Sequence, residues 1–185
     1  MTAIARLRRT YIDCRYGQLH VHQAIPAGGG FDEATALLCI PGSPGRGGFF
    51  QPLLASLGAD RSIYAPDLPG FGESDSAGTG AGAAQYALAF ADMLDSLRQR
   101  RVDVLAQGDG IHTAIALIKL RPGTLVHRCA LSAAPAVQLI EARSLTVPIH
   151  ELMLAGAADG AISSESIQPQ LNDLMGFFAT IAPQR

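Results

Sequence analysis

Apolar residues follow two different spacings along this chain, and each spacing predicts its own kind of element. Residues 10–14 and 18–25 alternate between apolar and polar positions around a short Arg-Tyr-Gly turn, which predicts an antiparallel hairpin. Other short runs are apolar enough to be strands buried in a sheet. These strand-like runs are 36–40, 63–65, 102–105, 126–131 and 149–154.

Helical spacing appears between the strand-like runs, where apolar residues recur every three or four positions. The predicted helices cover 49–57, 86–97, 111–120 and 171–181, with Pro169 just ahead of the last one. Strands that alternate with helices predict an α/β fold with a mostly parallel, doubly wound sheet, preceded here by the antiparallel hairpin. The chain has 185 residues, so we expect one domain, 1–185, around one core.

Composition narrows the function classes. Hydrophobic residues make up 48% of the chain and charged residues only 16%, below the usual quarter, which indicates a globular rather than a disordered chain. A net charge of −2 without a basic block argues against nucleic-acid binding. No apolar run has the length of a membrane span, and the first residues lack the order of a signal peptide, so we expect a cytoplasmic protein. Cys14, Cys39 and Cys129 lie in strand-like runs and are interpreted as reduced, buried thiols.

Residues 106–110 read Ala-Gln-Gly-Asp-Gly between a predicted strand and a predicted helix. A tight turn of small residues at this place is typical of a nucleophile elbow, which lifts one side chain above the sheet. The middle position of the frame is Gly108, which has no side chain with which to attack a substrate. The frame of an acyl-transfer site is therefore present without its central reagent.

Four segments in order resemble one family. They are Pro-Gly-Ser-Pro at 41–44, Asp-Leu-Pro-Gly-Phe-Gly-Glu-Ser at 67–74, the elbow at 106–110 and Gly-Ala-Ala-Asp-Gly at 156–160. Together they resemble the α/β-hydrolase fold, in the branch of epoxide hydrolases, haloalkane dehalogenases and related esterases. The second segment is the most specific of the four.

The resemblance implies roles for particular residues. The backbone N–H groups of Ser43 and Asp109 would form the oxyanion hole, which requires no particular side chain. Pro41 stands where the family has a histidine, which changes the loop beside that hole. Asp159 corresponds to the acid that orients the catalytic histidine. Asp67 is interpreted as a turn acceptor rather than a catalyst.

The other members of a Ser–His–acid triad are missing from their expected places. Gly108 cannot be a nucleophile, and residues 160–185 contain no histidine. All histidines lie upstream of Asp159, at His20, His22, His112, His127 and His150.

Two other residues are candidate substitutes for the missing catalytic groups. Asp109 resembles the aspartate nucleophile of dehalogenases shifted by one position, but a helix-start acid is the favoured interpretation. His112 is the candidate base, although a histidine at a helix start is more often structural. His20 and His22 have the spacing of metal ligands on one strand face. No acidic or cysteine partner is near them in the sequence, so we expect a surface face, no metal and no cofactor.

The stretch 132–148 is too short for the helical cap that this branch of the family carries, so the cap is expected to be reduced or absent, as is the last His-bearing strand. Three functions stay open: an unusual hydrolase of small esters or epoxides with weak or no activity, a non-catalytic pseudoenzyme that binds a ligand or partner, and a truncated form of an active hydrolase. The partners that we consider are a small molecule above the elbow and a second copy of the chain.

Overall fold

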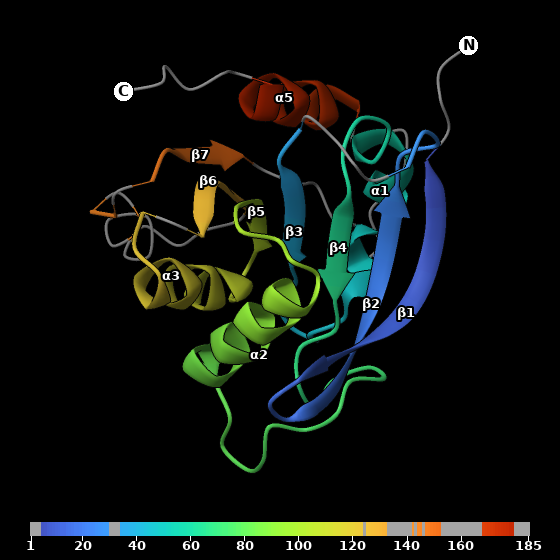
Figure 1. Cartoon of the computed structure of the whole chain (residues 1–185). Coiled ribbons are helices and arrows are strands. Elements are labelled where there is room, and N and C mark those ends of the chain that lie inside the picture. The colour runs from blue at the N-terminus through green and yellow to red at the C-terminus, as the bar shows by residue number, and fades with distance from the viewer. Residues whose placement is uncertain are drawn as a thin grey trace.

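The computed structural model describes residues 5–29, 34–123, 125–132, 142, 144–145, 147–152 and 168–179. Within them lies one seven-stranded sheet of order β1-β2-β4-β3-β5-β6-β7 (Figure 1). The strands are β1 (Arg6–Cys14), β2 (Gly17–Ile25), β3 (Ala36–Ile40), β4 (Ile63–Pro66), β5 (Val102–Gln107), β6 (Val126–Ser132) and β7 (Ile149–Leu152). The helical elements are η1 (Gly47–Phe50), α1 (Gln51–Leu57), α2 (Ala83–Ser96), α3 (Gly110–Leu120) and α5 (Gln168–Ala179).

The strand pairing confirms the predicted fold class. β1 and β2 form the antiparallel hairpin, and β2 continues antiparallel to β4. All remaining neighbours, from β4 through β3, β5 and β6 to β7, are parallel. β1 is the outer strand on one side, and its first four residues are exposed.

Helices cover both faces of the sheet, and the central strands are apolar on both sides for that reason. Leu38 and Ile40 of β3 pack in the cluster that contains the apolar residues of α2 and α3. Leu37 and Cys39, which point the other way, pack in the cluster of α1 and α5. Figure 1 shows α2 and α3 side by side on one face. This layering explains why the β3 sequence is continuously apolar instead of alternating.

The last helix begins earlier than predicted. It starts at Gln168, so Pro169 lies inside its first turn instead of ahead of it. Proline fits there because the first N–H groups of a helix have no partner within the helix. Among the helices that the structure describes, the longest is α2, with 14 residues. In the described part of the chain, no helix is both long enough and apolar enough to cross a membrane.

The three cysteines are free, and they differ in burial. Cys39 and Cys129 are fully buried, whereas Cys14 is half-buried. Burial raises the pKa of the Cys129 thiol to about 12 and raises the pKa of Cys39 as well. The prediction of buried thiols is therefore confirmed for two of the three.

We expect Cys14 alone to react quickly with Ellman's reagent in the native protein at mildly alkaline pH. Partial burial raises the pKa of Cys14 as well, so its advantage lies in access: the thiolate is the reactive form, and the reagent cannot reach the two fully buried thiols. Absorbance should show one fast equivalent, and all three after unfolding in guanidinium. The Cys14→Ser variant should lose the fast phase; a second fast equivalent in the native protein would contradict the burial described here.

Candidate functional site

The turn between β5 and α3 has the geometry of a nucleophile elbow. Gly108 adopts φ +55°, in the left-handed region that side chains rarely occupy. Its N–H donates to the Ser132 carbonyl at 2.9 Å, which ties the turn to the end of β6. A Cβ added at Gly108 would meet only the Gly42 Cα, at 3.9 Å. The nucleophile position therefore faces open space and holds no reactive group.

Two glycines let the loop after β3 press against this elbow. A Cβ added at Gly110 would lie 2.5 Å from the Pro41 carbonyl oxygen. A Cβ at Gly42 would lie 2.6 Å from an Asp109 carboxylate oxygen and 2.6 Å from the Gln107 carbonyl oxygen. The small residues that frame the elbow are thus required by close contact between the two turns.

Side chains of the elbow accept hydrogen bonds from backbone N–H groups of the facing loop. The Ser43 N–H donates to Asp109 Oδ1 at 2.6 Å, and the Gly42 N–H donates to Gln107 Oε1 at 3.2 Å. Ser43 was predicted as an oxyanion donor, and here its N–H already binds a carboxylate of the same chain. The role of Gln107 as an acceptor of the Gly42 N–H was not predicted from the sequence. Its position at the end of a buried strand, next to the elbow, could have indicated that role.

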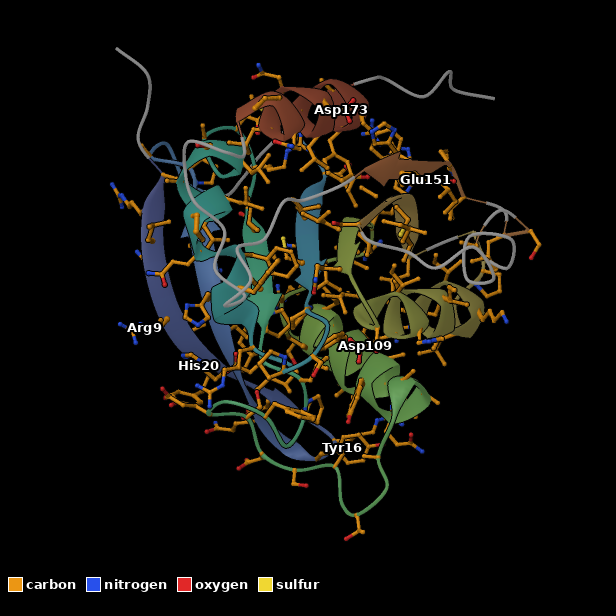
Figure 2. The ribbon with its side chains drawn as sticks, turned by 180° about the vertical axis from the view of Figure 1, so that it is seen from behind. Arg9, Tyr16, His20, Asp109, Glu151 and Asp173 are labelled. Atoms are coloured by element: carbon orange, nitrogen blue, oxygen red, sulfur yellow. The ribbon has the colours of Figure 1, made fainter. Side chains whose placement is uncertain are left out.

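Asp109 stands at the N-cap of α3, with helical backbone angles and an exposed side chain (Figure 2). A carboxylate is favoured there by the positive end of the helix dipole. His112 is exposed in the first turn of α3, and its backbone N–H donates to the Asp109 carbonyl at 3.1 Å. Ser43, Gly108 and Asp109 are thus brought together. Asp159 and most of the stretch in which the cap is expected to be reduced, residues 133–141, 143 and 146, lie outside the described residues.

His20 was expected on a surface face without an acidic partner, and this expectation is wrong. Its side chain is buried, and Nδ1 lies 2.9 Å from Asp67 Oδ2. Asp67 also accepts hydrogen bonds from the backbone N–H of Gly47, at 2.7 Å, and of Glu73, at 3.1 Å. The turn-acceptor role expected of Asp67 is therefore confirmed, and the same carboxylate is the missing partner of the histidine.

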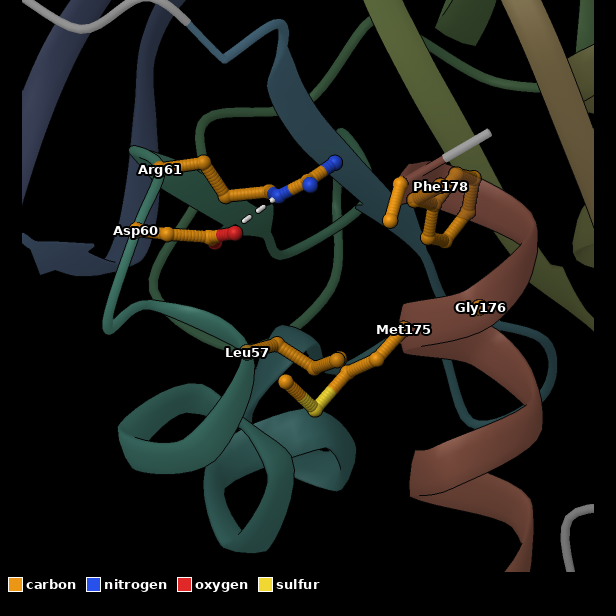
Figure 3. A pocket seen from close by; sticks show the side chains of 7 residues that line it. Leu57, Asp60, Arg61, Met175, Gly176 and Phe178 are labelled. Atoms are coloured by element: carbon orange, nitrogen blue, oxygen red, sulfur yellow. Dashed lines mark hydrogen bonds and ion pairs between the residues drawn. The ribbon is translucent and has the colours of Figure 1, made fainter. Parts of the chain in front are cut away.

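A separate cavity of about 270 Å³ lies between α1 and α5 (Figure 3). Its walls are Leu57, Asp60, Arg61, Met175, Gly176, Phe178 and Ala179. The Arg61 Nε–H donates a hydrogen bond to Asp60 Oδ1 at 3.1 Å, and the Arg61 guanidinium carbon lies 5.7 Å from the centre of the Phe178 ring. Arg61 Nη1 lies 3.4 Å from Oδ2 of the fully buried Asp103. Because Arg61 precedes β4 and Asp103 is the second residue of β5, this cavity lies at the opposite end of the sheet from the elbow.

Comparison with solved structures shows the same fold in three hydrolases. Carboxylesterase CesB from Bacillus subtilis is 20% identical with a TM-score of 0.59, over 68% of this chain and 42% of that one. An epoxide hydrolase from an endophytic Streptomyces is 19% identical with a TM-score of 0.61, over 70% and 38%. A Ser-to-Gly mutant of the N-acyl homoserine lactonase AidH, complexed with N-hexanoyl homoserine lactone, is 24% identical with a TM-score of 0.59, over 69% and 46%.

The matched region spans less than half the length of each of these proteins. Comparison with curated proteins gave no significant match. The sequence pattern of the alpha/beta hydrolase family, by contrast, matches residues 37–182, which is most of the chain. The matched region includes the elbow at 106–110 and the turn at 41–44 that faces it. This chain belongs to the alpha/beta hydrolase family.

Proposed function

We propose that this chain is a non-catalytic ligand-binding member of its family, with weak or no hydrolytic activity. One observation carries the proposal: the Asp109 carboxylate accepts the Ser43 N–H at 2.6 Å beside a nucleophile position that is glycine. The donor that would polarise a substrate carbonyl is bound to the chain itself. The reagent that would attack that carbonyl is missing.

The chemistry of acyl transfer explains why these two features matter together. The reaction needs a nucleophile activated by a base, and free donors aimed at the oxygen that becomes negative. A hydrogen bond to a carboxylate is stronger than one to a neutral carbonyl, so a substrate oxygen would displace Asp109 at a cost. Without its triad, an enzyme of this type retains only about 10³–10⁴-fold acceleration, from the oxyanion hole and binding. Because the Ser43 N–H is already bound to Asp109, even this residual acceleration is expected to be lower.

The space above Gly108 supports binding of a small molecule. Beyond its chain neighbours, a Cβ added there would meet no atom closer than 3.9 Å. The structural neighbours include a carboxylesterase, an epoxide hydrolase and a lactonase mutant that holds an intact lactone. We therefore propose a ligand with an ester or lactone carbonyl. Its carbonyl oxygen would accept the Ser43 N–H after the Asp109 carboxylate has rotated away from that donor. The competing function is a hydrolase that uses Asp109 and His112.

The Asp109→Ala variant is expected to bind N-hexanoyl homoserine lactone about three- to tenfold more tightly than the wild type, because one hydrogen bond of about 0.5–1.5 kcal/mol is no longer competed for. Isothermal titration calorimetry measures the affinity, and p-nitrophenyl butyrate reports turnover. Neither wild type nor variant should show an acyl-enzyme burst.

Two control variants make this test specific. Asp109→Asn keeps an oxygen that can accept the Ser43 N–H, so its lactone affinity should stay within about twofold of the wild type. Asp13→Ala removes an exposed carboxylate on β1 and should leave the affinity unchanged. Rapid ester turnover by the wild type, abolished in both Asp109→Ala and His112→Ala, would instead establish the hydrolase.

A further inference from the structure

His20, His22 and Asp67 form a compact group of potential metal ligands on the α1 side of the sheet. Each offers one ligand atom, and these atoms all lie within 4.8 Å of one another. His20 and His22 share one face of β2, and Asp67 directly follows β4. Because β2 pairs antiparallel with β4, with Val21 opposite Pro66, the chain places Asp67 beside His20. We propose that these three residues bind a Zn²⁺ ion.

The donor set suits this ion. Zn²⁺ binds imidazole nitrogen and carboxylate oxygen, and three protein ligands leave a fourth position for water. Two of the ligand atoms, His20 Nδ1 and Asp67 Oδ2, are already 2.9 Å apart. On binding, the imidazole would change tautomer, with its proton moving from Nδ1 to Nε2 by exchange with solvent, so that the Nδ1 lone pair and the carboxylate oxygen could each bond the metal.

The third ligand has room to approach. Bonds of about 2.0–2.2 Å in a tetrahedral site hold ligand atoms roughly 3.4 Å apart, so the His22 ring must turn toward the other two. His22 is half-buried, and its ring centre lies 4.9 Å from that of His20. It also lines a cavity of about 210 Å³. That cavity gives the ring space to turn and gives the ion a path from solvent.

The surroundings hold the first two ligands in place. The second Asp67 oxygen accepts the Gly47 N–H at 2.7 Å, which fixes the carboxylate plane. The Tyr11 ring packs on His20 with ring centres 5.4 Å apart, and the Tyr11 hydroxyl donates to the Glu73 carboxylate. Outer partners of this kind orient metal ligands and raise affinity.

Nearby charges act in both directions. Arg8 and Arg9 line the same cavity as His22 and oppose the approach of a cation. Asp67 in the group and Glu73 beside it offset that repulsion with two carboxylates. The arginines would favour an anion or water in the fourth position. We therefore expect micromolar affinity rather than the much tighter binding of a structural zinc finger.

Two strands, β4 and β3, separate β2 from β5 in the sheet, so the expected effect of the site is on stability rather than on chemistry at the elbow. A bound ion would connect β2 to the loop that follows β4. Because the unfolded chain does not hold these ligands together, binding to the folded state raises the melting temperature.

The test uses the full chain after treatment with a chelator. Zn²⁺ titrated at neutral pH is expected to bind with one equivalent in calorimetry and to raise the melting temperature, and Co²⁺ is expected to give visible ligand-field absorption. His22→Ala should weaken Zn²⁺ binding at least about tenfold while retaining the circular dichroism spectrum, because its side chain is half-buried and leaves the His20–Asp67 pair intact.

His150→Ala is the matched control. His150 Nε2 lies 2.8 Å from Asp173 Oδ2, a histidine–aspartate pair like that of His20 and Asp67, and it lies outside the three-residue group. The His150→Ala substitution should leave the affinity for Zn²⁺ unchanged. The proposal is overturned by absence of one-equivalent binding in the wild type, by equal affinity of His22→Ala and wild type, or by loss of binding in His150→Ala.

Discussion

Replacing Asp67 with alanine is expected to lower the free energy of unfolding by about 3–5 kcal/mol, the range found when one partner of a buried charged network is removed. The Asp67 side chain is almost fully buried and accepts hydrogen bonds from His20, Gly47 and Glu73. Alanine would leave these donors without an acceptor, and each unsatisfied buried donor costs about 1–3 kcal/mol. Urea unfolding followed by circular dichroism measures the change.

Asp75→Ala is the matched control for that experiment. Asp75 is an exposed aspartate of the same loop, and its carboxylate accepts the backbone N–H of Gln18 at 2.8 Å. Losing one exposed hydrogen bond should cost about 1 kcal/mol or less. An Asp67→Ala loss no larger than that of Asp75→Ala would show that the Asp67 network does not hold the loop to β2.

Replacing Gly110 with alanine is expected to cost about 2–3 kcal/mol, as overpacking of a close contact does. The new methyl group would lie 2.5 Å from the Pro41 carbonyl oxygen and 2.9 Å from that of Ile40, and backbone atoms cannot turn aside as a flexible side chain can. Alanine favours a helix over glycine by about 1 kcal/mol, so the clash must exceed that gain. Thermal and urea unfolding measure the net loss.

Alanine substitutions at two other glycines serve as comparisons for the stability change of Gly110→Ala. Gly176 lies within α5 with nothing near its missing Cβ, so Gly176→Ala should stabilise the protein by about 0.5–1 kcal/mol. Gly108 has open space but φ +55°, so Gly108→Ala should cost about 1–2 kcal/mol from backbone strain alone. A Gly110→Ala protein as stable as Gly176→Ala would mean that the two turns separate freely.

The sequence predicted those parts of the fold that depend on local pattern. The hairpin follows from alternation in β1 and β2, and β3 follows from five consecutive apolar residues, all of them buried. The elbow follows from small residues between a strand and a helix. In each case neighbouring residues carry the signal, because period and turn chemistry act over a few positions.

The contacts that define the site were less predictable because they join distant segments. His20 and Asp67 are 47 positions apart and meet only because β2 pairs with β4 rather than with β3. Ser43 and Asp109 were both predicted as backbone donors of one oxyanion hole. That the Asp109 side chain would bind the Ser43 N–H depends on how closely the two turns approach, and sequence spacing does not determine that distance.

The exposed outer strand β1 has a consequence for assembly. Its first residues include Arg6, Arg8 and Arg9, all exposed, and Figure 2 shows Arg9 on this edge. If two copies joined their sheets by antiparallel pairing of β1 with β1, these cations would lie opposite or diagonal to one another, which destabilises the pair. Charged side chains on an edge strand discourage such strand addition. A homodimer of this chain is therefore expected to form through a surface other than the β1 edge.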